Sequence, residues 1–161
     1  MNVSIVPIPE DATIQRIVAE WSIREWGADF PGDTTQTYID LYEQSCRVGD
    51  AMPKVYVAVD SDSSARVIGT VTIVADDELP NATEPGPWLA AMFVREDCRG
   101  SGVGRRLVSH CVDEAKRFGH RQLWLYTANH RAWYETLGWS FVRHTDLHGT
   151  RVDVMTRVLS S

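Results

Sequence analysis

A glycine-rich stretch in the second half of the chain reads Val94-Arg95-Glu96-Asp97-Cys98-Arg99-Gly100-Ser101-Gly102-Val103-Gly104. It lies between a nearly continuous apolar run, residues 88–94, and a helical stripe of apolar residues that continues to Phe118. The apolar run is typical of a strand that is covered on both faces. Glycines at the start of a helix leave main-chain N–H groups uncovered, and the helix dipole adds partial positive charge there. The stretch therefore predicts a cradle for an anion such as a pyrophosphate.

Glycines of this kind also form tight strand-to-helix turns that bind no ligand, and from the glycines alone the two interpretations are equal. Other nucleotide-binding motifs fit worse. A P-loop ends in Gly-Lys-Ser/Thr, whereas two arginines follow Gly104. A dinucleotide fingerprint needs a small residue at the position of Leu107 and an acidic residue after the next strand, which ends in Tyr126-Thr127.

Hydrophobic periodicity places further elements on both sides of this turn. The predicted strands are residues 3–8, 55–59, 67–74, 88–94, 123–126, 139–143 and 152–158. The predicted helices are one that Asp11 caps and Gly27 ends, one that runs up to Gly49, one over residues 103–118, and a short one over residues 130–137. The predicted order is therefore β-α-α-β-β-β-α-β-α-β-β.

Composition limits the classes of function. A length of 161 residues predicts a single domain over residues 1–161. A net charge of −6 argues against binding to nucleic acid or anionic lipid. No apolar run is long enough to cross a membrane and no signal peptide is recognisable, so we predict a cytoplasmic protein. Three cysteines without a CxxC spacing favour reduced thiols, and His144 and His148 do not share a helix face, so no metal site is predicted.

Two spaced segments resemble those of one known family. Arg99-Gly100-Ser101-Gly102-Val103-Gly104 is similar to the Arg/Gln-x-x-Gly-x-Gly/Ala motif of the GNAT N-acetyltransferase superfamily, which opens a helix after an apolar strand. Ala132-Trp133-Tyr134-Glu135-Thr136-Leu137-Gly138-Trp139 resembles the family's aromatic-Tyr-x-x-x-Gly-aromatic segment. The resemblance implies an α/β fold whose central sheet is mixed, mostly antiparallel and about seven-stranded, with about four helices on both faces.

The resemblance also implies acetyl-coenzyme A as co-substrate. Main-chain N–H groups from Gly100 to Gly104, including those of Ser101, Gly102 and Val103, would hold its pyrophosphate, and Arg99 begins this loop. Pantetheine would lie beside Phe93 and Val94 like an added strand. Thr127 stands where many members carry an asparagine that contacts pantetheine, while Asn129 is interpreted as a helix N-cap.

The implied chemistry is direct attack of an amine on the thioester within a ternary complex. Tyr134 matches the tyrosine that protonates the coenzyme A sulfur in many relatives. Main-chain N–H groups at Met92 and Phe93 are expected to stabilise the oxyanion. Because no acyl-enzyme is implied, Cys98 and Cys111 are interpreted as packing thiols.

The general base is the least determined residue. Four carboxylates precede the strand at residues 88–94, and solvated loop charge explains them equally well: Asp76, Asp77, Glu78 and Glu84. Glu84 is favoured because it is closest to Trp88. Family members build the acceptor pocket largely from the first two helices, which here carry aromatic and acidic residues: Trp21, Trp26, Phe30, Tyr38, Tyr42, Glu25, Asp29 and Asp33. Most of these aromatics are expected to belong to the core, although aromatics with carboxylates can hold a cation.

The predicted function is acetyl transfer from acetyl-coenzyme A to a primary amine of a small molecule or peptide. Two alternatives stay open at this stage. One is a non-catalytic acyl-coenzyme A sensor domain of the same fold, and the other is a different nucleotide-binding enzyme. The identity of the acceptor amine and the presence of a homodimer are also open.

Overall fold

The computed structural model describes residues 1–160 of the chain. Its strands form one sheet in the order β1-β2-β3-β4-β5-β7-β6, in which only β4 and β5 are parallel. The strands are β1 (Val3–Pro7), β2 (Lys54–Asp60), β3 (Arg66–Val74), β4 (Trp88–Val94), β5 (Gln122–Thr127), β6 (Ser140–Leu147) and β7 (Thr150–Val158). The helices are α1 (Ala12–Trp26), α2 (Thr35–Arg47), α3 (Val103–Arg117) and α4 (Arg131–Thr136). The mixed, mostly antiparallel sheet with helices on both faces confirms the predicted fold class.

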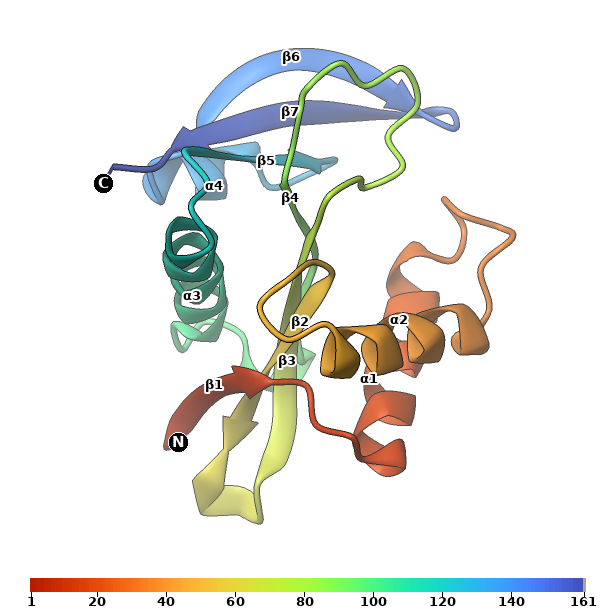
Figure 1. The fold of residues 1–161 in the computed structure, drawn as a ribbon, viewed down its shortest axis with the longest axis vertical. Helices are drawn as coiled ribbons and strands as arrows, with labels where there is room; N and C mark the ends of the chain where they lie inside the picture. The colour runs from red at the N-terminus through yellow and green to blue at the C-terminus, as the bar shows by residue number, and fades with distance from the viewer. Residues whose placement is uncertain (161) are drawn as a thin grey trace.

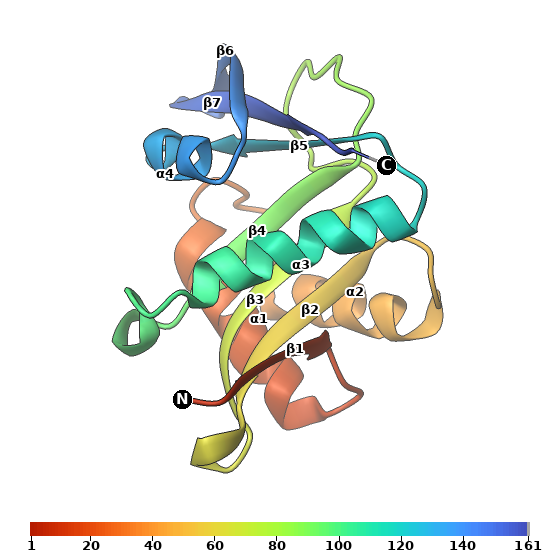
Figure 2. The ribbon, with the colours of Figure 1, turned by 90° about the vertical axis from the view of Figure 1, so that its left-hand side faces the viewer.

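Helices cover both faces of the sheet because alternate strand residues point to opposite sides. Figure 1 shows α1 and α2 on one side of β2, β3 and β4, and α3 on the other. On β2, Val55 and Val57 are buried in the cluster that contains Val18 of α1. Tyr56 between them belongs to the opposite cluster, with Leu107 of α3. In Figure 2, α3 lies diagonally across the strands, so its first turn reaches the end of β4.

The helices begin where the sequence indicates. Asp11 is the N-cap of α1, as predicted, and its carboxylate accepts hydrogen bonds from the N–H groups of Thr13 and Ile14 at 2.9 and 3.1 Å. Thr34 and Thr37 form a reciprocal capping box at the start of α2. These caps satisfy N–H groups that a helix leaves unpaired, which distinguishes α1 and α2 from α3.

The sheet opens between its two parallel strands. β4 and β5 are paired only at Trp88 and Trp124, and the Trp124 N–H donates to the Pro87 carbonyl at 3.0 Å. Beyond this point the strands diverge, and Figure 1 shows β5 turned away from the direction of β4. The divergence leaves one edge of β4 without a neighbouring strand.

The hairpin of β6 and β7 is longer than predicted. β6 does not end at Arg143 but pairs with β7 as far as Leu147, which lies opposite Thr150. The additional residues are mostly polar, and His144 binds Asp153 of β7 at 2.6 Å across the pair. No helix within residues 1–160 has both the length and the apolar character that a membrane span needs.

Candidate functional site

The loop between β4 and α3 ends in a helix terminus that no side chain caps. Gly100 and Gly102 have φ angles of 79° and 86°, a region that L-residues with side chains rarely adopt. Gly102 is the N-cap of α3, and it provides no side-chain hydrogen bond to the first turn. A side chain at either glycine would meet no atom within 4 Å. The first turn of α3 therefore presents unpaired N–H groups and partial positive charge to open space.

Two side chains of this loop stabilise its shape from within. The Arg99 Nε donates to the Val94 carbonyl at 2.9 Å, and the guanidinium lies 5.4 Å from the centre of the Phe93 ring. The Ser101 hydroxyl donates to the Cys98 carbonyl at 2.6 Å. Arg99 therefore holds the loop against the end of β4, and Ser101 closes the turn within the loop.

Gly104 allows the start of α3 to approach α4 closely. A Cβ at this position would lie 3.3 Å from the Trp133 ring and 3.7 Å from Val94. Val103, beside it, is buried in the core under α3. The glycine motif therefore combines two requirements, which are left-handed backbone at Gly100 and Gly102 and close packing at Gly104.

A cavity of about 1230 Å³ opens in front of this loop. Its glycine-loop end is bordered by the start of α3 and by the diverging ends of β4 and β5. The residues expected at the co-substrate that line the cavity are Phe93, Val94, Arg99, Gly100, Gly102, Val103, Gly104, Thr127 and Tyr134. Ser101 is the one predicted contact whose side chain turns into the loop instead.

A β-bulge lies where β4 borders the cavity. Thr70 pairs with Phe93 and Thr72 pairs with Ala90, so Ala91 and Met92 together lie opposite one residue of β3. Ala91 has a φ of 51°, in the left-handed region. A bulge leaves a main-chain group outside the hydrogen-bond ladder. The bulge falls at Met92 and next to Phe93, whose N–H groups were expected from the sequence to stabilise an oxyanion.

Tyr134 is a buried tyrosine of α4 whose hydroxyl has no hydrogen-bond partner within residues 1–160. Only 6% of its surface is exposed, and the rings of Trp133 and Trp139 lie edge-on at centroid distances of 4.9 and 6.0 Å. Burial, and to a smaller extent Cys111, raises the pKa of Tyr134 above its usual range. The phenol therefore stays protonated at neutral pH and can donate into the cavity.

Thr127, at the end of β5, fixes the turn that leads to Tyr134. Its hydroxyl accepts a hydrogen bond from the N–H of His130 at 3.1 Å. His130 is the N-cap of α4, so the interpretation of Asn129 as the cap was wrong. His130 makes no side-chain capping bond, and the Thr127 hydroxyl, three residues upstream, binds its N–H instead. The hydrogen of this hydroxyl is free to donate.

The structure does not bring Glu84 to the cavity. Its carboxylate receives hydrogen bonds from Arg143 of β6, at 2.9 Å from Nε and 3.1 Å from one Nη. The Glu84 side chain is 6% exposed. Glu84 does not line the cavity and its carboxylate is bound by Arg143, so we no longer consider Glu84 as the base.

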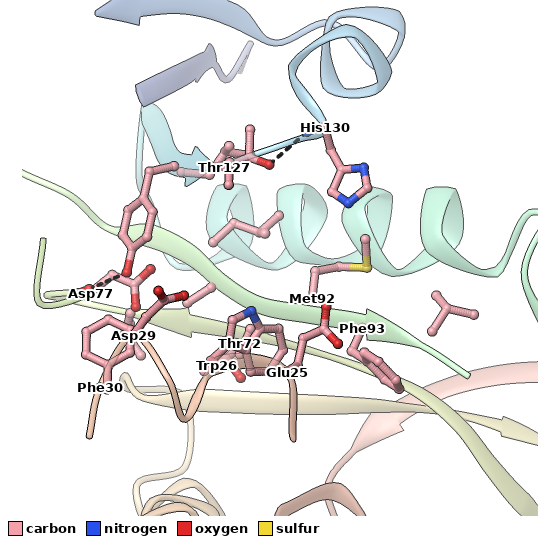
Figure 3. Close-up of a pocket in the computed structure, with 18 of the residues that line it drawn as sticks. Glu25, Trp26, Asp29, Phe30, Thr72, Asp77, Met92, Phe93, Thr127 and His130 are labelled. Atoms are coloured by element: carbon pink, nitrogen blue, oxygen red, sulfur yellow. Dashed lines mark hydrogen bonds between the residues drawn. The ribbon is translucent and has the colours of Figure 1, made fainter. Parts of the chain in front are cut away.

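The other end of the cavity is acidic. Figure 3 shows side chains around it from the end of α1, from the connection between α1 and α2, from β3 and from the β3–β4 loop, including Glu25, Trp26, Asp29, Phe30 and Asp77. We call this the acidic end, and its carboxylates are Glu25, Asp29, Asp33, Asp40, Asp76, Asp77 and Glu78.

Three of the five aromatics considered from the sequence line this cavity, namely Trp26, Phe30 and Tyr38. The other two, Trp21 and Tyr42, are buried in the core. Thr72 was missed, because a threonine inside an apolar strand reads as an ordinary strand residue. Cys98 and Cys111 are buried, and burial raises the pKa of both thiols, which supports their interpretation as packing residues.

Comparisons with known proteins agree with this geometry. A family model described as Acetyltransferase (GNAT) family matches residues 17–139. No curated protein gives a significant match.

Several solved structures share the fold. An aminoglycoside 6'-N-acetyltransferase complexed with coenzyme A has a TM-score of 0.74 at 14% identity, and the match covers 98% of both chains. Spermidine N-acetyltransferase from Vibrio cholerae, in complex with CoA and spermine, has a TM-score of 0.71 at 15% identity over 98% of this chain and 96% of the other. A chain of the NatC complex bound to Gag peptide and CoA has a TM-score of 0.71 at 18% identity, covering 99% of this chain and 100% of the other.

Proposed function

The chain belongs to the GNAT acetyltransferase family, and from this premise we propose that it transfers the acetyl group of acetyl-coenzyme A to a primary amine of a small molecule or peptide. The observation that carries the proposal is the uncapped start of α3. Its bare N–H groups open onto the same cavity as the β4 bulge and the Tyr134 hydroxyl. An anion site, oxyanion donors and a proton donor on one cavity are the parts that thioester aminolysis needs.

Acetyl-coenzyme A fits this cavity by its chemistry. The pyrophosphate is assigned to the N–H groups between Gly100 and Gly104, where the helix dipole favours negative charge. The pantetheine amides are assigned to the free edge of β4 at Phe93 and Val94, where they replace the missing strand pairing with β5. Thr127 can donate its hydroxyl to the same arm. The three relatives described above were each solved with coenzyme A, which supports the assignment.

The proposed reaction is a direct transfer. The neutral amine nitrogen forms a bond to the thioester carbonyl carbon, and the carbonyl oxygen becomes an oxyanion next to the β4 bulge. The C–S bond then breaks, and Tyr134 gives its proton to the departing thiolate. The amine loses one proton to a carboxylate of the acidic end or to water, and Tyr134 is reprotonated from solvent. The products are an amide and free coenzyme A.

The acceptor is proposed to be an amine because the acidic end can hold a cation before the amine is deprotonated. The relatives point the same way by the molecules in their names, which are an aminoglycoside, spermidine with spermine, and a peptide. The non-catalytic alternative keeps the co-substrate site and predicts no transfer.

Release of free thiol tests the proposal. The protein is incubated with acetyl-coenzyme A and a library of primary amines, and the coenzyme A thiol is measured with a chromogenic disulfide. We expect amine-dependent thiol release with formation of an equal amount of acetylated amine by mass spectrometry. If acetyl-coenzyme A binds but no amine is acetylated, the sensor interpretation replaces the enzyme. A calorimetric titration in which ATP or NAD competes with acetyl-coenzyme A would instead support a different nucleotide-binding enzyme.

Replacement of Glu84 tests its assignment as a structural residue. We expect Glu84→Gln to lower the free energy of unfolding by about 1–3 kcal/mol, because Arg143 loses its charged partner at a buried site. The folded variant should keep its kcat, measured by thiol release. Glu43→Gln is the matched control, since Glu43 pairs with Arg47 on the surface and its loss should cost less than about 1 kcal/mol. A stable Glu84→Gln protein with severely reduced kcat would restore Glu84 as a catalytic residue.

A further inference from the structure

The acidic end of the cavity carries more negative charge than one ammonium group would need. None of its seven carboxylates forms an ion pair with a Lys, Arg or His of residues 1–160. The arginines that line the cavity, Arg99 and Arg105, come from the glycine loop and from the first turn of α3. Glu84 shows the contrast, because this buried carboxylate outside the cavity has a guanidinium partner. Asp29, Asp33 and Asp77 are partly buried, and partly buried charges without protein partners favour a ligand that supplies counterions.

These carboxylates lie at two positions along the cavity. In Figure 3 the Glu25 side chain points from the end of α1 toward β4 at Met92, where the bulge lies. Asp29 and Asp77 lie farther along, near Tyr126. The Tyr126 hydroxyl donates to the main-chain carbonyl of Asp77 at 3.0 Å. Burial is the main reason that the pKa of Tyr126 is raised, and the charges of Asp77 and Asp29 raise it further. One anionic position is therefore next to the reaction point and a second is separate from it.

An independent polar group faces the same space. Thr72 of β3 lines the cavity with only 2% of its surface exposed, and its hydroxyl makes no hydrogen bond to any residue that the structure describes. Figure 3 shows it between the side chains of the two anionic positions. The hydroxyl oxygen is not among the sealed, unpartnered polar atoms of the described residues, so it is open to the cavity and can accept a hydrogen bond from an ammonium group.

Aromatic rings separate and flank the two positions. Trp26, Phe30, Tyr38 and Tyr126 line the acidic end. Their faces suit the methylene groups of an amine, and they attract its cationic ends. Burial, and to a smaller extent the charges of Glu78 and Asp76, holds the pKa of Asp77 well above its usual range. A bound cation beside Asp77 would lower this pKa and stabilise the carboxylate.

Resting on the proposed function, we propose that the acceptor is a small molecule with at least two ammonium groups. Its reacting amine lies between Glu25 and the β4 bulge, and a second ammonium group that is not acetylated is held by Asp29 and Asp77. Only the first nitrogen forms the amide bond and loses a proton, so the second keeps its charge and acts as the anchor. Polyamines and amino sugars share this chemistry.

Matched pairs of amines test the proposal with the intact protein and acetyl-coenzyme A. The linear probes are cadaverine and pentylamine, with aminopentanol as the probe whose second end is polar but uncharged. The cyclic probes are diaminocyclohexane and cyclohexylamine. We expect kcat/KM for each diamine to exceed that of its monoamine and of aminopentanol by about 10- to 100-fold, the size of one or two charge-assisted hydrogen bonds. The ratio between the linear and the cyclic diamine then distinguishes a flexible from a ring-shaped acceptor.

Variants locate the second position. The double change Asp29→Asn with Asp77→Asn should lower kcat/KM for cadaverine by about 10-fold or more, mainly through KM, and lower that for pentylamine by a clearly smaller factor. The control is Asp113→Asn, an exposed carboxylate of α3 outside the cavity.

Because folding raises the pKa of Asp77, its ionisation destabilises the fold as pH rises through that pKa. Asp77→Asn should therefore melt at an equal or higher temperature at neutral pH, and lost turnover would not reflect unfolding.

The outcomes separate the two proposals. Equal kcat/KM for diamines and monoamines, with clear turnover of both, would overturn the two-ammonium acceptor and leave the acetyltransferase in place. An equal loss of cadaverine and pentylamine turnover in the double variant would also overturn it. Absence of turnover with every amine, while acetyl-coenzyme A binds, would overturn the proposed function and this inference with it.

Discussion

Tyr134→Phe is expected to lower kcat by about 100- to 10,000-fold, the contribution of a positioned general acid. The substitution removes one oxygen and no ring atoms, so the packing against Trp133 and Trp139 stays in place. The hydroxyl has no hydrogen-bond partner within residues 1–160, so its loss leaves no protein group unsatisfied. Stability should therefore be close to that of the parent protein, and the effect should be confined to turnover.

Two measurements separate chemistry from binding. The affinity for acetyl-coenzyme A, measured by calorimetry, should change less than about threefold, while thiol release at saturating co-substrate falls by the factor given above. Tyr56→Phe is the matched control. Tyr56 is also a buried tyrosine, but its hydroxyl donates to Glu114 at 3.2 Å beneath α3, outside the cavity. That variant should lose some stability and keep its kcat.

The pH profile adds a readout that a structural role would not affect. Because burial raises the pKa of Tyr134, kcat of the parent should not fall through ionisation of this phenol below about pH 10. In Tyr134→Phe the thiolate must take its proton from water, whose concentration does not depend on pH, so kcat should be lower than that of the parent at every pH below about 10. An unchanged kcat in Tyr134→Phe, with the parent active, would show that Tyr134 is not the proton donor.

The sequence was sufficient to predict the parts of the fold that depend on residues close together in the chain. The apolar stripe of α3, the cap at Asp11 and the glycine loop all express short-range rules of helix and turn formation. The end of β6 was not predictable, because its last residues are polar and are held by pairing with β7 rather than by their own propensity. A cytoplasmic location, a single domain and a homodimer stay predictions.

The site divides in the same way. Residues of the glycine loop are adjacent in the chain, so their role could be predicted from spacing. Glu84 and Arg143 are separated by 59 positions, and nothing local reveals that they bind each other. Likewise Glu25, Thr72 and Asp77 come from α1, β3 and the β3–β4 loop, and only the folded sheet brings them to one cavity. The acidic end was therefore visible as separate charges but not as a binding site.

Gly102→Asp is expected to weaken acetyl-coenzyme A binding by about 100-fold or more. Gly102 is the N-cap of α3, with a φ of 86° and open space where a side chain would project. A carboxylate there would lie beside the N–H groups assigned to the pyrophosphate, and it would both cover them and repel the ligand. Loss of two charge-assisted hydrogen bonds alone corresponds to about 3 kcal/mol or more. Calorimetric titration with acetyl-coenzyme A measures the effect directly.

Two controls isolate the charge from the backbone. Gly102→Asn imposes nearly the same backbone cost without the negative charge, since Asn and Asp both tolerate the left-handed region better than other residues. Its affinity should fall clearly less than that of Gly102→Asp. Gly119→Asp places the same side chain on a glycine with a φ of 89° and open space at the opposite end of α3, so it should reduce stability and leave binding intact. If Gly102→Asp binds acetyl-coenzyme A as tightly as the parent, the pyrophosphate lies elsewhere, because two negative charges cannot share one helix terminus without a large loss of affinity.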